Sequence, residues 1–152
     1  MQGSQNKINI RNRKASFNYE LVEKFIAGIV LGGTEIKSLR QGRANLADAF
    51  CFFRDDELWV RGMHIAEYSF GSYNNHDPAR ERKLLLNRRE LNKLKKKSQE
   101  KGFTIVATRL FVNERGLAKL EIALARGKRE YDKRHDIKER DSKKELARLK
   151  KI

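Results

Sequence analysis

Two neighbouring segments in the second half of the chain alternate apolar and polar residues with a period of two, and they constrain the fold most. They are residues 103–112 (FTIVATRLFV) and 117–124 (LAKLEIAL). Such alternation is typical of β-strands. The four residues between them, NERG at 113–116, have the polar and glycine content of a hairpin loop. We therefore expect an antiparallel pair, and on its second strand three residues point the same way: Leu120, Ile122 and Leu124.

A long run rich in isoleucine and valine lies nearer the start of the chain. Residues 17–39 contain FIAGIVLGGTEIKSL, in which Gly28, Gly32 and Gly33 interrupt the apolar residues. Glycines inside strands often mark bulges or the corners of a barrel. We therefore expect one long bent strand, or two strands joined at a glycine kink. The paired glycines lack the spacing of a phosphate loop, so we interpret them as a bend.

Two shorter β-rich runs complete the predicted sheet. They cover residues 49–53 and 57–63, and the RDD segment at 54–56 suits the hairpin turn between them. About five or six antiparallel strands with one substantial helix are typical of a small barrel, of the kind that includes OB-folds. A β-sandwich is the alternative architecture. The fold class that we expect is therefore mainly β.

One helix is predicted at about residues 87–101. Asn87 and Glu90 form a capping-box-like pair at its start, and Gly102 suits the position after its last turn. Leu91 and Leu94 give it a narrow apolar stripe, which leaves most of its lysines to water. Just before the helix, basic residues run into three leucines at 84–86. We expect the leucines to pack the start of the helix onto the barrel and to leave three cations at the rim: Arg80, Arg82 and Lys83.

The charge of the chain points to a polyanionic partner. The net charge is +15 and the pI is about 10.1. Residues 80–101 carry ten Lys/Arg and three Glu, and residues 126–152 carry 12 Lys/Arg and six Asp/Glu, so two segments supply most of the excess. Nucleic acid is the first candidate for such a partner, and an acidic membrane surface is a distant second.

The sequence indicates a cytoplasmic protein. There is no run of 18 apolar residues that would span a bilayer, and the first 14 residues lack the apolar stretch of a secretory signal. The single cysteine, Cys51, excludes a disulfide framework and suits a reducing compartment, where we expect it to be a small core residue.

Both ends of the chain are predicted to lie outside the folded domain. Residues 1–14 are polar and basic, and we expect a flexible arm there. Residues 127–152 open with GKREYDKR and have almost nothing to bury, so they cannot offset their own ordering entropy. We expect this basic tail to be disordered when free and to order on a large anionic partner. The folded domain then covers residues 15–126.

Catalysis is not indicated. His76 and Asp77 resemble part of a catalytic set, but neighbouring residues seldom point at a common target, and the NHDP segment has ordinary turn chemistry. One cysteine and three scattered histidines have no metal-ligand spacing, and the common hydrolase and phosphate-loop motifs are absent. We expect no enzyme activity, metal, cofactor or small-molecule ligand. An enzyme that acts on RNA through His76 and Asp77 stays a remote alternative.

Several aromatic residues are candidates for stacking on unpaired bases. Trp59 and Phe53 have apolar strand neighbours, which favours the core for both, whereas Tyr19 follows Asn18 outside an alternating run, so core and surface both stay open for it. The other rings considered are Phe17, Tyr68, Phe70 and Tyr73. From composition and pattern alone, a general OB-type binder of single-stranded RNA, or a ribosome-associated protein, stays open.

Six blocks in a fixed order carry a resemblance to a known family. The chain resembles the SmpB family of SsrA-binding proteins, the partners of transfer-messenger RNA (tmRNA) in bacterial ribosome rescue. The resemblance covers about residues 12–140, and this chain has Ile26 where many members have an acidic residue before the Ala-Gly pair. The blocks are NRKASFNY (12–19), AGIVLGGTEIKSLR (27–40), ANLAD (44–48), HIAEY (64–68), NHDPARERKLLLN (75–87) and GKREYDKRHDIKERD (127–141).

The resemblance implies a small closed antiparallel OB-like barrel with peripheral helices. It implies that the barrel grips the tRNA-like domain of tmRNA and delivers it to stalled ribosomes for trans-translation, and that the free protein is a monomer. Matching the motifs residue by residue gives these tmRNA-contact candidates: Asn12, Arg13, Lys14, Tyr19, Lys37, Arg40, Arg80, Arg82 and Lys83.

For the tail, the resemblance implies a second site on the ribosome. The tail would enter the empty mRNA channel and the decoding site and become helical there. An aromatic residue or histidine at the position of Tyr131 is consistent with stacking on an rRNA base. The candidates for the decoding site are Gly127, Lys128, Tyr131, Asp132, Lys133 and Arg134.

Overall fold

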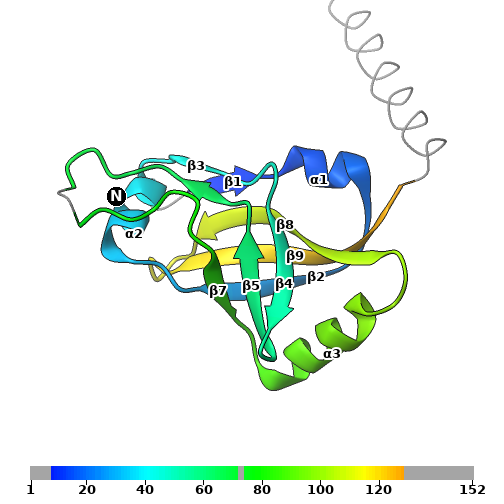
Figure 1. Ribbon diagram of the computed structural model, residues 1–152. Helices are drawn as coiled ribbons and strands as arrows, with labels where there is room; N and C mark the ends of the chain where they lie inside the picture. Colours follow the sequence, from blue (N-terminus) through cyan, green and yellow to red (C-terminus); the bar gives the residue numbers. More distant parts are fainter. Residues whose placement is uncertain (1–7, 72–73, 129–152) are drawn as a thin grey trace, which may run out of the picture.

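Six antiparallel strands close into a barrel. The computed structural model describes residues 8–71 and 74–128 (Figure 1). The main sheet has the order β1-β8-β4-β5-β7-β2-β9, and a further pairing of β8 with β9 closes the ring. The elements are β1 (Asn9–Arg11), α1 (Arg13–Asn18), β2 (Tyr19–Ile29), α2 (Gly33–Arg40), β3 (Ala44–Asn45), β4 (Phe50–Arg54), β5 (Glu57–Arg61), β6 (His64–Ile65), β7 (Arg82–Leu85), α3 (Arg88–Ser98), β8 (Phe103–Val112) and β9 (Ala118–Gly127).

Strand β8 is the seam of the barrel. One of its edges pairs with β9 along almost its whole length, from Phe103 opposite Arg126 to Val112 opposite Ala118. Its other edge pairs with β4 at Ile105 and Val106 and, further along, with β1. This double use of one edge lets β1 extend the wall beyond the closed ring, so the barrel predicted from the sequence is confirmed with an added strand.

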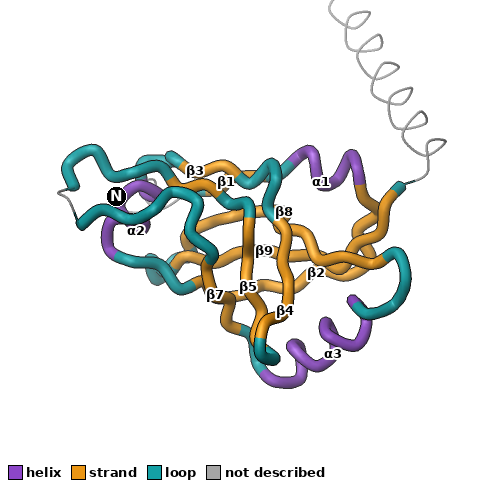
Figure 2. Tube along the Cα trace, viewed as in Figure 1, coloured by secondary structure: helices purple, strands orange, loops and turns teal. Residues whose placement is uncertain are grey.

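The hairpin of β8 and β9 confirms the prediction from period-two alternation. Leu120, Ile122 and Leu124 are buried together inside the barrel. The opposite face of β9 is also covered, because Ala123 and Ala125 are fully buried against Ala15 of α1 in a small second cluster. Alanines allow the close approach of a helix to a strand. The first helix therefore packs on the outside of the wall (Figure 2).

The segment predicted as a bent strand is a strand followed by a helix. β2 ends at Ile29, and α2 begins at Gly33. The carboxylate of Glu35 accepts a hydrogen bond from the Gly32 N–H at 2.8 Å, which satisfies a backbone donor at the start of the helix. The paired glycines are thus a helix start, and their interpretation as a bend was wrong.

Two further expectations are corrected. The three leucines at 84–86 do not act together: Leu84 is buried in the barrel as part of β7, Leu85 is exposed, and only Leu86, just before the helix cap, packs the start of the helix against the core. Residues 9–14 are not a flexible arm: β1 pairs with β8, and Asn12 caps α1 by accepting a hydrogen bond from the Ala15 N–H at 3.2 Å. Contacts with distant strands, which local composition does not reveal, order both segments.

The predicted helix is confirmed as α3. Asn87 and Glu90 exchange the capping-box hydrogen bonds, and Leu91 and Leu94 pack into the core. The helix ends at Ser98, before the expected residue 101, and Gly102 follows with φ +88°.

The turn between β4 and β5 is also confirmed. It has two residues, Asp55 and Asp56, with φ of 52° and 62°, as in a type I′ hairpin. Phe53 is half-buried against the core as expected, but Trp59 is half-buried on the outer face, so its assignment to the core was wrong.

Gly62, after β5, provides a test of the close packing at that end of the barrel. Its φ is +82°, and an added Cβ would overlap the backbone carbonyl oxygen of Asp48. Gly62→Ala is expected to lower the free energy of unfolding by roughly 2–4 kcal/mol, from backbone strain and overlap together. Gly42→Ala is the control, because φ there is +74° with open space around it. That variant should lose only about 1–2 kcal/mol. Equal losses in urea unfolding would contradict the overlap.

Candidate nucleic-acid interface

A buried ion cluster lies under the end of the barrel where α2 meets β7. The carboxylate of Glu35 is 2.5 Å from the guanidinium of Arg80 and 2.5 Å from that of Arg82. The side chains of Glu35 and Arg82 are 1% and 0% exposed, whereas that of Arg80 is 40% exposed. Only Arg80 presents its charge to solvent, so the expectation that Arg82 lies at the rim was wrong.

Arg82 is instead a structural cation. Its guanidinium donates to the backbone carbonyls of Met63 at 2.9 Å, Arg80 at 2.9 Å and Pro78 at 3.1 Å. These bonds tie the loop before β7 to the barrel. Burial lowers the pKa of Arg82, and Glu35 opposes that effect, so the cation is kept by its carboxylate partner.

Glu35 is held ionised by its donors. Burial alone would raise its pKa, but hydrogen bonds from Arg80, the Gly32 N–H and Arg82 together lower the pKa below the ordinary 4.5. The carboxylate therefore fixes two arginines and one helix start at once. Arg80 also donates to the Val30 carbonyl at 3.2 Å, which orients its exposed guanidinium at the end of β2.

Cations and rings meet on the same end of the barrel. Lys37 and Arg40 lie exposed in the last turn of α2, and the Lys37 ammonium is 5.5 Å from the centre of the Tyr68 ring. The Tyr68 ring contacts that of Phe70 edge to face at 5.6 Å, and Phe70 is 81% exposed. An exposed ring next to the Lys37–Tyr68 pair is a suitable surface for an unpaired base.

His76 and Asp77 stabilise the loop between β6 and β7. The Ile65 carbonyl can only accept, so Nε2 of His76 donates to it at 2.9 Å and Nδ1 accepts from the Thr34 hydroxyl at 2.9 Å. Asp77 accepts from the Ala79 N–H at 3.0 Å. Both ring nitrogens and the carboxylate are engaged in loop contacts, in agreement with the structural role expected for them.

Only some of the candidates in the first block, residues 12–19, face solvent. Asn12 is 7% exposed, and its amide donates to the carbonyls of Leu46 and Ala107 at 2.8 Å each, so it is a structural residue and not a surface contact. Arg13 is exposed, and Lys14 is exposed with Asp48 3.4 Å away. Tyr19 is half-buried, with its side chain against the small cluster under α1.

The outer face of β4, β5 and β7 carries a cluster of charged and aromatic side chains that the sequence patterns did not reveal as a cluster. The Arg54 and Arg61 guanidiniums lie over the Phe52 ring at 5.1 and 4.8 Å, and Glu81 pairs with both at 2.7 and 2.5 Å. Lys83 lies opposite Trp59 and pairs with Glu57. Lys83 was a candidate from the sequence, but Arg54 and Arg61 were not, because they come singly from alternating positions of β4 and β5.

The tail leaves the barrel at a fixed point. Gly127 is the last residue of β9 and lies opposite Tyr19, and the Lys128 N–H donates to the Asn18 carbonyl at 3.0 Å. The other four candidates for the decoding site lie outside the described residues: Tyr131, Asp132, Lys133 and Arg134.

Within the described ranges, no group of three or more metal-ligating side chains is found. Over the same ranges, none of the helices is long and apolar enough to cross a membrane.

Comparison with known proteins gives one family. A family model described as SmpB protein matches residues 9–152. An SsrA-binding protein of Phocaeicola vulgatus is 59% identical over 142 residues, which are 93% of this chain and 95% of that protein. One of Bacteroides thetaiotaomicron is 57% identical over 145 residues, 95% of this chain and 97% of that protein.

A solved structure matches as well. It is described as "tmRNA-SmpB: a journey to the center of the bacterial ribosome", and one of its chains has a TM-score of 0.69 and 44% sequence identity. The match covers 86% of this chain and 94% of that chain.

Proposed function

The chain belongs to the SmpB protein family, and we propose on this premise that it binds SsrA RNA, that is tmRNA, and acts with it on the ribosome in trans-translation. The observation that carries the proposal is the match over residues 9–152, at high identity, to proteins named for this RNA. The chain is an RNA-binding protein and not an enzyme. Its net charge of +15 suits a polyanionic partner.

The barrel offers a preorganised surface for the tRNA-like domain. Arg80 is oriented by Glu35 and Val30, and Lys37 by the Tyr68 ring, so these cations need little ordering when RNA binds. Arg40 and Arg13 add exposed charge, and Lys14 and Lys83 keep partly exposed ammonium groups in surface pairs. Arg82 and Asn12 position this surface from beneath.

Binding measurements test the proposal. The full chain is expected to prefer a folded tRNA-like RNA over a single strand of the same length. An equal affinity for both would favour the alternative, a general OB-type single-stranded RNA binder. Salt dependence does not separate the two, because both neutralise phosphates and release counterions.

We assign the tail to the ribosome. Residues 127–152 would occupy the decoding site and the mRNA channel and become helical there, which defers the entropic cost of ordering until an empty channel is present. The free protein would be a monomer, since a net charge of +15 opposes self-association. Its proposed location is the cytoplasm.

Tyr131 provides the sharpest test of the tail. Tyr131→Ala is expected to reduce peptide tagging on ribosomes stalled without mRNA in the decoding site, because it removes the ring that would stack on an rRNA base. Tyr131→His should keep most of the tagging, since an imidazole also stacks. The affinity for tmRNA should be the same in both variants and in the wild type. Normal tagging by the alanine variant would refute the stacking role.

A further inference from the structure

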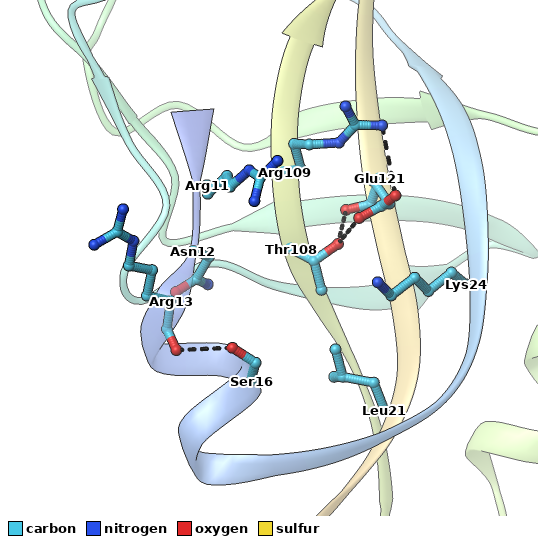
Figure 3. A pocket seen from close by; sticks show the side chains of 9 residues that line it. All are labelled: Arg11, Asn12, Arg13, Ser16, Leu21, Lys24, Thr108, Arg109 and Glu121. Atoms are coloured by element: carbon cyan, nitrogen blue, oxygen red, sulfur yellow. Dashed lines mark hydrogen bonds and ion pairs between the residues drawn. The ribbon is translucent and has the colours of Figure 1, made fainter. Parts of the chain in front are cut away.

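A cleft of about 370 Å³ opens on the outer wall of the barrel, away from the ion cluster under α2. It lies between β1, α1, β2, β8 and β9 (Figure 3). Figure 3 shows Arg11 extending towards Arg109 and Lys24 extending into the cleft from β2, whereas Arg13 points away from it beside the start of α1. The full lining is Arg11, Asn12, Arg13, Ser16, Leu21, Lys24, Thr108, Arg109 and Glu121.

Two β-bulges shape this cleft. The register of β2 against β9 shifts between Leu21 and Glu23, and that of β8 against β9 shifts between Ala107 and Arg109. A bulge changes the direction of the side chains beside it. Thr108 lies in the second bulge, and its hydroxyl donates to the Glu121 carboxylate at 2.8 Å.

Hydrogen bonds and an ion pair fix the walls of the cleft. The Asn12 N–H donates to the Thr108 carbonyl at 2.8 Å, and the Asn12 amide binds the neighbouring Ala107 carbonyl. The Arg109 guanidinium lies over the Phe111 ring at 4.1 Å and is 3.6 Å from Glu121. The single carboxylate that lines the cleft is therefore engaged with Thr108 and Arg109.

The remaining charge of the cleft is not neutralised. Arg11 and Lys24 are exposed, and among residues 8–71 and 74–128 neither forms an ion pair with a carboxylate. In contrast, Lys14, Arg80 and Lys83 each have such a pair. Arg11, Lys24 and Arg109 against Glu121 give the cleft a net charge of +2.

We propose that this cleft binds phosphate groups of the RNA backbone, an inference that rests on the proposed function. Unpaired guanidinium and ammonium groups gain most from a phosphate, which forms charge-assisted hydrogen bonds and releases counterions. No aromatic side chain lines the cleft, so it has no stacking surface for a base. Its volume is in the range of small-ligand sites and accommodates a phosphate with part of its sugar.

The test uses the full chain with two charges removed. Arg11→Gln with Lys24→Gln is expected to weaken binding of the tRNA-like RNA by about tenfold or more, because it removes charge-assisted hydrogen bonds. The log–log salt slope should fall by roughly 0.9 for each phosphate that the variant no longer neutralises. Arg115→Gln with Lys101→Gln is the matched control, because it removes two exposed charges beyond the two ends of β8. The control should bind with nearly the wild-type slope.

Neutral methylphosphonates placed one at a time in the RNA locate the phosphate that the cleft binds. One or two adjacent positions should weaken binding of the wild type and of the control, but have no further effect on the Arg11/Lys24 variant. The same interference map for all three proteins would overturn the proposal. A second result would also overturn it: inorganic pyrophosphate shifts the NMR signals of the cleft, but the two substitutions leave the RNA affinity unchanged. The cleft would then bind a free anion and not the RNA backbone. Loss of preference for tRNA-like RNA by the wild type would instead refute the proposed function.

Discussion

Glu35→Ala is expected to lower the free energy of unfolding by about 3–5 kcal/mol, because it leaves the buried Arg82 cation without its carboxylate. The Arg82 side chain is fully buried, so water cannot replace the missing partner. The same substitution removes the acceptor for the Gly32 N–H at the start of α2. For a domain whose total stability is roughly 5–15 kcal/mol, this is a large fraction.

Glu81→Ala is the matched control. Glu81 also pairs with two arginines, Arg54 and Arg61, but its side chain is 27% exposed, against 1% for Glu35. Exposed pairs contribute little, so this variant should unfold at nearly the wild-type urea concentration. Similar losses in the two variants would show that burial of the Glu35 cluster does not matter.

The pH dependence tests whether the charge of Glu35 is what stabilises the fold. The folded state lowers the pKa of Glu35 below 4.5, so the stabilisation by Glu35 is complete above that value and is lost as the pH falls through the lowered pKa. The difference in unfolding free energy between the wild type and Glu35→Ala should therefore shrink on acidification below about pH 4.5. A difference that stays constant with pH would mean that the charge of Glu35 is not what stabilises the fold.

Removal of residues 129–152 is expected to abolish tagging on stalled ribosomes and to leave most of the affinity for tmRNA. The barrel surface that we assign to tmRNA lies entirely before residue 129, whereas four of the six decoding-site candidates are removed with the rest of the tail. The truncation keeps Gly127 and Lys128, because both are hydrogen-bonded or paired within the barrel. Tagging in a reconstituted translation system and direct RNA binding measure the two effects separately.

A shuffled tail controls for charge. A chain that keeps the composition of residues 129–152 in a different order should bind tmRNA as the wild type does and should still fail in tagging. Equal losses of affinity and tagging on truncation would contradict the division of work between barrel and tail. Full tagging by the shuffled chain would show that charge alone is sufficient.

Local pattern predicted the parts of the fold that depend on neighbours in the sequence. The hairpin of β8 and β9, a hairpin turn within residues 54–56 and the cap at Asn87 were all predicted and are confirmed, although Arg54 belongs to β4 and only Asp55 and Asp56 form the turn. Their signals, which are alternation, turn residues and capping pairs, occur within a few residues of each other.

Long-range contacts decided the rest. The burial of Arg82 depends on Glu35, 47 residues earlier, and that of Asn12 on Ala107, 95 residues later. A basic residue next to other basic residues resembles a surface charge until its partner is known. The cleft was not predicted for the same reason, because Arg11, Lys24 and Arg109 come from three different strands that only the fold brings together.

The end of β9 limits the distance between the barrel, which we assign to tmRNA, and Tyr131, which we assign to the decoding site. Lys128 is tied to Asn18 by a backbone hydrogen bond, and Tyr131 follows only three residues later. Three residues span at most roughly 10 Å when fully extended. The length of the chain therefore limits how far Tyr131 can lie from Lys128. When bound RNA fixes the position of the barrel, it also limits the positions that the Tyr131 ring can reach. On our proposal that Tyr131 stacks on an rRNA base, a correct fit of the ring would also report that the RNA-bound barrel is in place.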